Sequence, residues 1–297
     1  MKLRAWLRAA RPLAHGNIAP PILLGEAMAS SGRTLDLSLL VCAHLFGVLD
    51  QLVIVFANDF ADEETDRNNA TSTPFSGGSR VLVRGELRAH DLGRAALVMS
   101  ASLLVFSGVV GWLFARPYLP LFAVVALALM QAYSFAPLKL SYRGGGELLQ
   151  GLGIGIVLPT LGYYMQRGSL EGLSPWALFA LFLFGVAGNV LTALPDTASD
   201  RLSQKRTWSV LFGEHHARTR AMAIVSLAQV LLAFSLHVRV LETGLVLLIP
   251  SVALLIAIRW LPAGDSSHRK PLLFFLISAA GAMTFAELGW SIALWMR

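Results

Sequence analysis

Long runs of apolar residues alternate with short polar connections along most of this chain. Most of the runs are close to the ~20 residues that an α-helix needs to cross the hydrocarbon core of a bilayer. The pattern predicts an all-α integral membrane protein, with nine transmembrane helices in one domain that covers residues 1–297. The runs cover about 12–31, 35–57, 92–115, 118–137, 146–165, 174–194, 220–238, 241–261 and 271–295.

The composition supports this prediction. Of the 297 residues, 55% are hydrophobic and only 14% are charged, whereas soluble proteins average about 25% charged residues. A soluble core of this size could not bury so much apolar surface, so a soluble globular protein is excluded. The single cysteine, Cys42, excludes an intramolecular disulfide.

Lysine and arginine are divided unevenly between the two sides of the predicted bundle. Nineteen of the 24 fall in the N-terminal segment and in the connections that follow the even-numbered runs. Because cytoplasmic loops carry an excess of these residues, the N-terminus is predicted to lie in the cytoplasm and the protein in the cell membrane. This distribution also argues against nucleic acid as the reason for the net charge of +6. The five residues on the other side are Arg33, Arg116, Arg167, Arg239 and Arg297.

The first apolar run is expected to be retained as a helix. A basic segment precedes it, and Ala27-Met28-Ala29 resembles a signal-peptide cleavage site. Polar groups inside a spanning helix usually face the bundle interior. The run makes a poor signal core because it contains His15, Asn17, Pro20, Pro21 and Glu26.

Two acidic clusters stand at the ends of apolar runs. The first reads N-D-F-A-D-E-E-T-D over Asn58–Asp66, and the second reads D-T-A-S-D over Asp196–Asp200. Each cluster opens a long connection, about 58–91 and 195–219, on the predicted cytoplasmic side. Loops of this length in a compact protein are usually functional.

The aspartates of both clusters have helical spacing. Asp59, Asp62 and Asp66 share one helix face, and so do Asp196 and Asp200. Packed carboxylates repel one another and resist entering lipid, so a cation is expected between them. An all-oxygen site beside phosphate groups is typical of Mg²⁺. The basic residues on the same side are Arg80, Arg84, Lys139, Arg143, Lys205 and Arg206.

Carboxylates, a divalent metal and basic side chains together indicate a diphosphate site at the mouth of an apolar bundle. A substrate with a charged head and an apolar tail fits such a place, and isoprenyl diphosphates are molecules of this kind. The metal would stabilise the departing diphosphate, and aromatic side chains would shield the carbocation that develops.

The chain resembles the UbiA superfamily of intramembrane prenyltransferases over nearly its whole length. Both acidic motifs carry the resemblance, together with Lys205-Arg206-Thr207 after the second motif. Arg11-Pro12 before the first helix and Tyr133-Ser134-x-x-Pro137-x-Lys139 after the fourth add to it. The resemblance implies a nine-helix bundle around a central cavity that opens to lipid.

The resemblance also implies roles for individual residues. Mg²⁺ would be held by the predicted catalytic aspartates Asp62, Asp66, Asp196 and Asp200, with Asp59 as a supporting member. The resemblance places Asn58, Arg11, Tyr133 and Lys139 at the diphosphate. The charge and position of Lys205 and Arg206 predict that they bind the diphosphate as well.

The stretch Tyr133–Glu147 most resembles menaquinone-pathway enzymes, which prenylate 1,4-dihydroxy-2-naphthoate with loss of its carboxylate. Phe135-Ala136 stands where glycines are common, Gln204 replaces a usual glycine, and the segment 74–80 is atypical. The aromatic acceptor is therefore open between dihydroxynaphthoate, 4-hydroxybenzoate and non-quinone molecules such as a chlorophyllide, haem or a polar lipid precursor.

A cation-coupled transporter is the alternative from another functional class. Asp50, Glu147 and Glu287 fall within or near apolar runs, and intramembrane acids often mark ion paths. Transporter sites usually lie near the middle of the membrane, whereas the acidic clusters here lie at helix ends beside phosphate-binding cations. The pattern therefore favours the prenyltransferase hypothesis over the transporter hypothesis.

Overall fold

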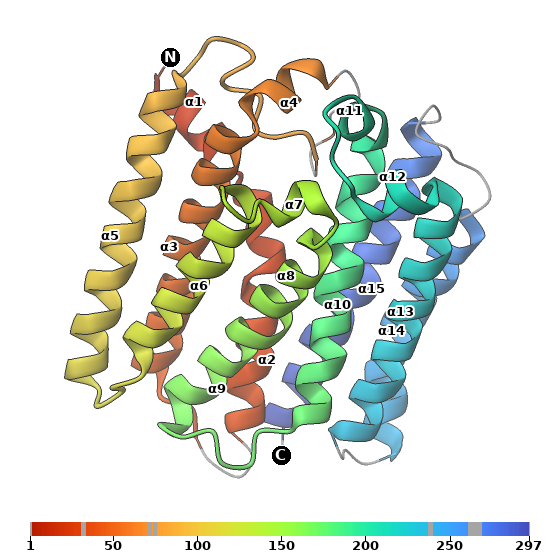
Figure 1. Ribbon diagram of the computed structural model, residues 1–297. Coiled ribbons are helices and arrows are strands. Elements are labelled where there is room, and N and C mark those ends of the chain that lie inside the picture. Colours follow the sequence, from red (N-terminus) through yellow and green to blue (C-terminus); the bar gives the residue numbers. More distant parts are fainter. Residues whose placement is uncertain are drawn as a thin grey trace.

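The computed structural model shows an all-helical protein (Figure 1). Three basic residues used in the charge distribution, Arg33, Arg239 and Arg297, lie outside the described residues, as do parts of the first long connection. The structure describes residues 2–30, 34–69, 73, 76–236, 240–260 and 269–296.

The helices follow one another with short connections, except where the two long connections interrupt them. In chain order they are α1 (Lys2–Ala9), η1 (Pro12–Asn17), α2 (Ala19–Ala29), α3 (Leu37–Ala61), α4 (Glu63–Asn68), α5 (Ala89–Leu113), α6 (Leu119–Ser134), α7 (Leu140–Arg143), α8 (Gly146–Leu152), η2 (Gly153–Val157), α9 (Leu158–Arg167), α10 (Pro175–Ala193), η3 (Leu194–Asp196), α11 (Thr197–Leu202), α12 (Trp208–Phe212), α13 (Glu214–Ser235), α14 (Val240–Trp260) and α15 (Arg269–Trp295).

Within the described residues, six helical segments are long and apolar enough to cross a membrane. Two shorter apolar helices, Leu119–Ser134 and Val246–Arg259, accompany them. The prediction of an all-helical membrane protein is therefore confirmed. The six segments are Leu37–Ala61, Ala89–Leu113, Gly146–Arg167, Pro175–Leu202, Glu214–Ser235 and Lys270–Trp295.

The first predicted run, 12–31, is divided between two elements, η1 and α2. Arg11 adopts a left-handed backbone conformation (φ 43°) directly before Pro12. Proline has no amide hydrogen and disfavours a helical conformation in the residue before it, so α1 cannot continue through this position. The break between α1 and η1 brings the Arg11 guanidinium to Asp59 near the end of α3.

Glycines allow the central helices to approach backbone to backbone. A Cβ atom at Gly25 would lie 2.0 Å from the carbonyl oxygen of Pro159, and one at Gly162 would lie 2.2 Å from the facing backbone of α2. A Cβ atom at Gly155 would lie 2.2 Å from the carbonyl oxygen of Leu181. Small residues allow such close packing in membranes, so α2 is held against α9, and η2 against α10.

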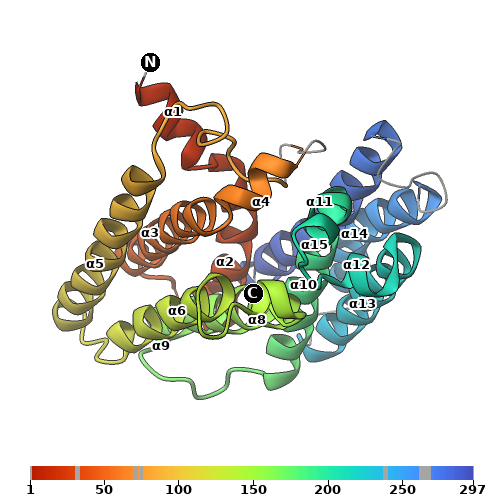
Figure 2. The same ribbon diagram turned by 45° about the horizontal axis from the view of Figure 1, so that its top comes forward.

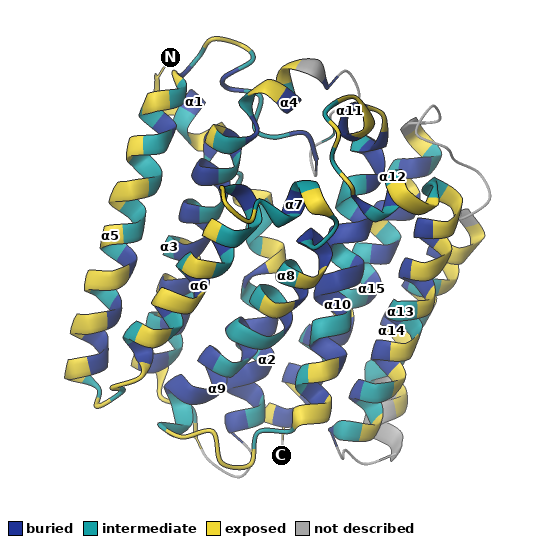
Figure 3. Ribbon diagram, in the orientation of Figure 1, coloured by how far each residue is buried: buried dark blue, intermediate teal, exposed yellow. Residues whose placement is uncertain are grey.

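The short helices gather at one end of the bundle. α4, α11 and α12 lie at the end that also holds the N-terminus, while the C-terminus lies at the opposite end (Figures 1 and 2). Exposed positions follow the outward side of α5 (Figure 3), where Leu97, Val105 and Trp112 are exposed. Large apolar side chains on the outside are expected where a protein surface faces lipid rather than water.

Replacing Gly162 by alanine is expected to destabilise the fold. The added methyl group would collide with the α2 backbone, and overpacking of this kind costs about 1–3 kcal/mol. Gly108→Ala on the exposed side of α5 is the matched control, because nothing lies within 4 Å of its added Cβ atom. Thermal unfolding in one detergent should show a lower Tm for Gly162→Ala alone, and equal Tm values would contradict the packing argument.

Candidate functional site

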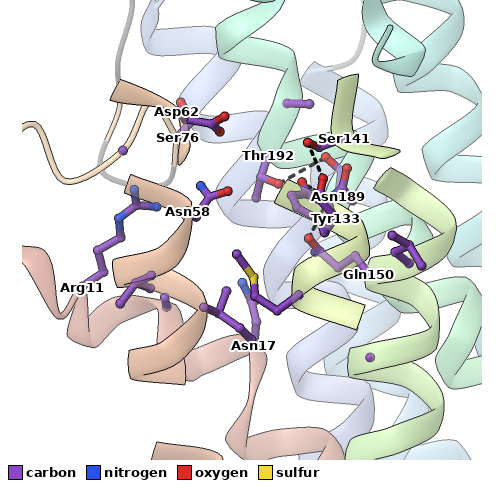
Figure 4. A pocket seen from close by; sticks show the side chains of 18 of the residues that line it. Arg11, Asn17, Asn58, Asp62, Ser76, Tyr133, Ser141, Gln150, Asn189 and Thr192 are labelled. Carbon is purple, nitrogen blue, oxygen red and sulfur yellow. Dashed lines mark hydrogen bonds between the residues drawn. The ribbon is translucent and has the colours of Figure 1, made fainter. Parts of the chain in front are cut away.

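A cavity of about 300 Å³ lies among α3, α6, α8, η2 and α10 (Figure 4). Carboxylates from both acidic clusters line one end of it, and apolar side chains line much of the rest. Asp50, Ile54 and Asn58 of α3 are each four residues apart and all line the cavity, so one face of this helix runs along it. The apolar lining includes Ile18, Ile54, Val55, Met130, Ile154, Val157 and Leu158.

The first acidic cluster spans the junction between α3 and α4. Asp62 ends α3 with a non-helical conformation, yet its amide bonds to the Asn58 carbonyl and its carbonyl accepts from the Asp66 amide. The side chains of Asn58, Asp62 and Asp66 therefore keep nearly helical spacing, and all three line the cavity. The amide oxygen of Asn58 accepts a hydrogen bond from the Ser134 hydroxyl at 3.3 Å.

The second acidic cluster lies where α10 passes through η3 into α11. Asp196 and Asp200 both line the cavity. The Asp196 carboxylate accepts a hydrogen bond from the Asn69 side chain at 2.7 Å, and the Asp200 carboxylate accepts one from the Thr207 hydroxyl at 3.3 Å. Because Asn69 follows the first cluster, this contact joins the two acidic segments.

Lys205 stands between the two clusters. Its ammonium group lies 3.0 Å from the carboxylate of Asp62 and 4.0 Å from that of Asp200. Burial alone would lower the pKa of the ammonium group, but the two carboxylates outweigh this effect and raise the pKa. Lys205 therefore carries a positive charge that compensates acids from both motifs.

Two backbone contacts hold the segment that carries Lys205. The amide of Arg206 donates to the carbonyl of Tyr142 at 3.2 Å, and the amide of Trp208 donates to the buried Glu147 carboxylate at 2.8 Å. The glycine-rich turn before Glu147 thus anchors the second long connection over the cavity. This gives the intramembrane acid Glu147 a structural partner.

The pKa of Asp66 is raised to about 7. Burial is the largest cause, followed by the negative charges of Asp59 and Asp62, while the cations Arg11 and Lys205 act in the opposite direction. Negative neighbours thus add to the effect of burial at this end of the cavity, the acidic rim, which is formed by Asp62, Asp66, Asp196 and Asp200. Within the described ranges, no three Asp, Glu, His or Cys side chains are grouped closely enough to hold a metal by themselves.

Arg11 and Asp59 form a pair at the edge of the cavity. The guanidinium donates to the Asp59 carboxylate, which also accepts from the hydroxyl and the amide of Ser79. Arg11 lines the cavity, whereas Asp59 does not. The Nε atom of Arg11 is buried without a hydrogen-bond partner, so the guanidinium retains donor capacity for a ligand.

Three polar side chains lie on the wall opposite Arg11 and Asn58 (Figure 4). The Asn189 amide nitrogen donates to the Tyr133 hydroxyl at 3.2 Å and to the Gln150 amide oxygen at 2.6 Å. These residues come from α10, α6 and α8. Tyr133 is therefore placed in the cavity, as the sequence predicts for a ligand-binding residue.

Two of the predicted diphosphate-binding residues lie away from the cavity lining. The ammonium group of Lys139 sits 3.8 Å from the centre of the Tyr142 ring, and the side chain of Arg206 is exposed. Neither residue lines the cavity. Their contact with diphosphate stays a prediction.

Tyr142 is a site residue that sequence reasoning missed. Its hydroxyl donates to the Asp62 carboxylate at 2.8 Å and lies 2.7 Å from the Thr65 hydroxyl. Burial, and next the charge of Asp62, raise its pKa, so the phenol stays protonated as a donor. The ring of Tyr142 also lies beside two lysines, Lys139 and Lys205. No local sequence pattern predicts these contacts, although Tyr142 belongs to the Tyr133–Glu147 stretch.

A second missed feature is the segment Ser76–Ser79, which bridges the two clusters. Ser76 and the Gly77 amide bond to Asp196, Gly78 packs against Asp66, and Ser79 bonds to Asp59. Gly77 and Gly78 both have positive φ angles, which glycine adopts readily. The Ser-Gly-Gly-Ser sequence is typical of a turn with positive φ angles, and it was the one pattern from which this segment could have been predicted.

Comparison with known proteins identifies a family. Residues 18–289 match the model of the UbiA prenyltransferase family. Over 211 residues, 71% of this chain, the sequence is 25% identical to 1,4-dihydroxy-2-naphthoate octaprenyltransferase from Bacillus subtilis (strain 168). The match spans 66% of that relative's length, just under two thirds.

Solved structures share the fold at low sequence identity. A UbiA homolog from Archaeoglobus fulgidus bound to GPP and Mg²⁺ superposes with a TM-score of 0.70 at 17% identity, covering 99% of this chain and 100% of the other. Digeranylgeranylglyceryl phosphate synthase gives a TM-score of 0.64 at 16% identity, covering 100% and 99% of the two chains. At these identities the likeness concerns the fold.

Replacing Gly78 by alanine is expected to disturb the acidic rim. The residue has φ +70°, and a Cβ atom would lie 1.9 Å from an Asp66 carboxylate oxygen. Gly85→Ala is the matched control, because Gly85 has a similar φ of +65° with nothing within 4 Å. Binding of Mn²⁺, measured by electron paramagnetic resonance, should weaken several-fold in Gly78→Ala only. Equal weakening in both variants would assign the effect to backbone strain.

The stability of the protein in chelator is expected to fall as the pH rises from about 4 to about 7. Asp66 has a pKa of about 7 in the folded protein, against ~3.9 for an unfolded chain. The folded protein therefore binds more protons in this range, and linkage lowers its stability as those protons leave. Asp66→Asn should reduce the slope of Tm against pH. An unchanged slope would contradict the assignment.

Proposed function

Because this chain belongs to the UbiA prenyltransferase family, we propose that it transfers an isoprenyl chain from a prenyl diphosphate to an aromatic acceptor in the membrane. One observation carries this proposal. Two acidic motifs, far apart in the sequence, meet around Lys205 at one end of a cavity whose remaining walls are largely apolar. A charged head and an apolar tail need these two environments side by side.

The topology we propose has nine membrane crossings, with the N-terminus and the acidic rim on the cytoplasmic side of the cell membrane. Six long apolar segments and two shorter ones support eight of these crossings. The ninth crossing would be formed by η1 and α2 together, which have six and eleven residues. The surplus of basic residues at this end supports the orientation.

The side chains at the rim suit Mg²⁺ and a diphosphate. Carboxylate oxygens are the ligands that Mg²⁺ prefers, and a bound cation would relieve the repulsion that Asp59 and Asp62 add to the effect of burial on Asp66. The buried, unpartnered Nε atom of Arg11 offers a donor to a phosphate oxygen. Bound Mg²⁺ would neutralise charge on the departing diphosphate.

The roles we propose follow from the contacts of each residue. The metal would be held by Asp62, Asp66, Asp196 and Asp200, with Asn58 beside them. Asp59 would act through Arg11, which it orients. Lys205, released from its carboxylates, would bind the diphosphate together with Arg11 and Tyr133, while Tyr142 would keep Asp62 in position.

The reaction we propose is an electrophilic substitution. The bond between the first prenyl carbon and the diphosphate oxygen breaks, and its electron pair leaves with the diphosphate. A ring carbon of an electron-rich aromatic then forms a bond to the prenyl carbon. The apolar walls exclude water, which would otherwise capture the cation.

We propose 1,4-dihydroxy-2-naphthoate as the acceptor, within menaquinone biosynthesis. The Bacillus subtilis relative supports this choice at 25% identity, as does the Tyr133–Glu147 stretch. The alternatives are 4-hydroxybenzoate or a non-quinone acceptor such as a polar lipid precursor.

Purified protein in liposomes tests these proposals directly. Labelled polyprenyl diphosphates of several lengths would be supplied with Mg²⁺ and either dihydroxynaphthoate or 4-hydroxybenzoate. Product with dihydroxynaphthoate alone is expected, and product with 4-hydroxybenzoate alone would replace the acceptor. Absence of Mg²⁺-dependent turnover with every length and acceptor would overturn the prenyltransferase proposal and favour an ion path.

Asp62→Asn and Asp196→Asn are each expected to lower the rate by about 10²-fold or more, because each removes one preorganised charge from the site. Asp91→Asn, at the start of α5 and outside the cavity lining, is the matched control and should keep the wild-type rate. Near-full Mg²⁺-dependent turnover in Asp62→Asn or Asp196→Asn would refute the proposed metal site.

A further inference from the structure

Asp50 is a buried acid that none of the roles above uses. It lies in the middle of α3, is only 5% exposed, and lines the same cavity as the acidic rim. Over the part of the chain that the structure describes, no hydrogen bond or ion pair reaches its carboxylate. Burying a carboxyl group without a hydrogen-bond partner costs free energy. A bound ligand that donates a hydrogen bond or a proton to Asp50 would remove this cost.

Gln51, the next residue along α3, has hydrogen-bond partners, in contrast to Asp50. Gln51 donates to the carbonyl oxygens of Ala10 and Arg11 and accepts from the His15 ring at 2.7 Å. Gln51 thus braces the break between α1 and η1. Asp50 has no such partner among the described residues, and it lines the cavity.

The position of Asp50 along α3 suits the aromatic acceptor better than the prenyl diphosphate. Asn58 follows Asp50 by eight residues on α3, which is about 12 Å along the helix, and both line the cavity. Diphosphate bound at the rim leaves room between these levels for the first prenyl carbon and an aromatic ring. A prenyl tail could not satisfy a carboxyl group, whereas a ring hydroxyl can.

We propose that Asp50 is the proton acceptor for the aromatic substrate, in an acceptor subsite that takes a hydroxyarene. This inference rests on the proposed function. Asp50 takes the proton of a ring hydroxyl, and the freed electron pair moves into the ring as the ring carbon bonds to the first prenyl carbon. The attacked carbon then loses its hydrogen as a proton to the released diphosphate, or its carboxylate as carbon dioxide. Asp50 returns its proton to the oxygen and the ring is aromatic again.

The amide cluster on the opposite wall completes the subsite. Gln150 and Asn189 line the cavity and are fixed to each other by a 2.6 Å hydrogen bond. Amide groups suit a second oxygen substituent of the ring, because they offer both donors and acceptors. An acid on one wall and amides on the other would hold a ring that carries oxygen on two sides.

The test compares two acceptors with two variants. The first acceptor carries a free hydroxyl, and the second is its methyl ether, which has no hydroxyl proton to give. Asp50→Asn should lower kcat by about 10²-fold with the hydroxyl acceptor, the usual size of general base catalysis. With the methyl ether, Asp50→Asn and wild type should differ by less than about threefold.

Glu287→Gln is the matched control, because Glu287 is also a buried carboxyl group of a spanning helix but does not line the cavity. It should keep the wild-type rate with both acceptors. Prenyl diphosphate affinity and Tm should stay at wild-type values in Asp50→Asn, which separates a chemical role from a folding defect. Asp50→Glu should recover part of the lost rate.

A loss of equal size with both acceptors would overturn the assignment and leave Asp50 a structural role. Wild-type rates of Asp50→Asn with the hydroxyl acceptor would also overturn it. If wild-type protein transfers no prenyl chain at all, the proposed function fails first and the assignment falls with it. The two failures are therefore distinguishable by the wild-type rate.

Discussion

A positive charge stands between the carboxylates at the ends of α3 and α10 and allows the two acidic clusters to lie close together. Lys205 supplies it, with Asp62 at 3.0 Å and Asp200 at 4.0 Å. Neighbouring carboxylates with no cation between them would repel, most strongly where burial limits the access of water. The other contacts of the rim, including those of Asn69 and Tyr142, reinforce a junction that this charge makes possible.

Irregular backbone gives the junction its shape. Arg11 with its left-handed φ, the paired glycines Gly77 and Gly78, and the turn before Glu147 all place polar groups where a continuous helix could not. Close glycine contacts between α2 and α9 keep the wall behind them rigid. Regular helices thus build the apolar walls of the cavity together with the polar groups of Asp50, Gln150 and Asn189, and the breaks between helices build its acidic end.

Hydropathy predicted the helices well where a run is long and uniform. The run 35–57 became α3, and the run 271–295 became α15. The acidic clusters were found because their spacing is local. The division of the run 12–31 into η1 and α2 was missed because hydropathy does not distinguish a short 3₁₀ helix from the α-helix that follows it. Contacts such as Tyr142 with Asp62 join distant segments, so no local pattern encodes them.

The pairing of Lys205 and Arg11 with carboxylates also bears on which molecules are kept out. Every cell contains high concentrations of soluble phosphates, and a bare cluster of cations would collect them. An anion that binds Lys205 must displace Asp62 from it, so charge alone gains it little. In the proposed function, burial of a hydrocarbon tail would supply the remaining free energy. Selection against nucleotides and inorganic phosphate would then be set by the cost of exchanging partners rather than by the size of the opening.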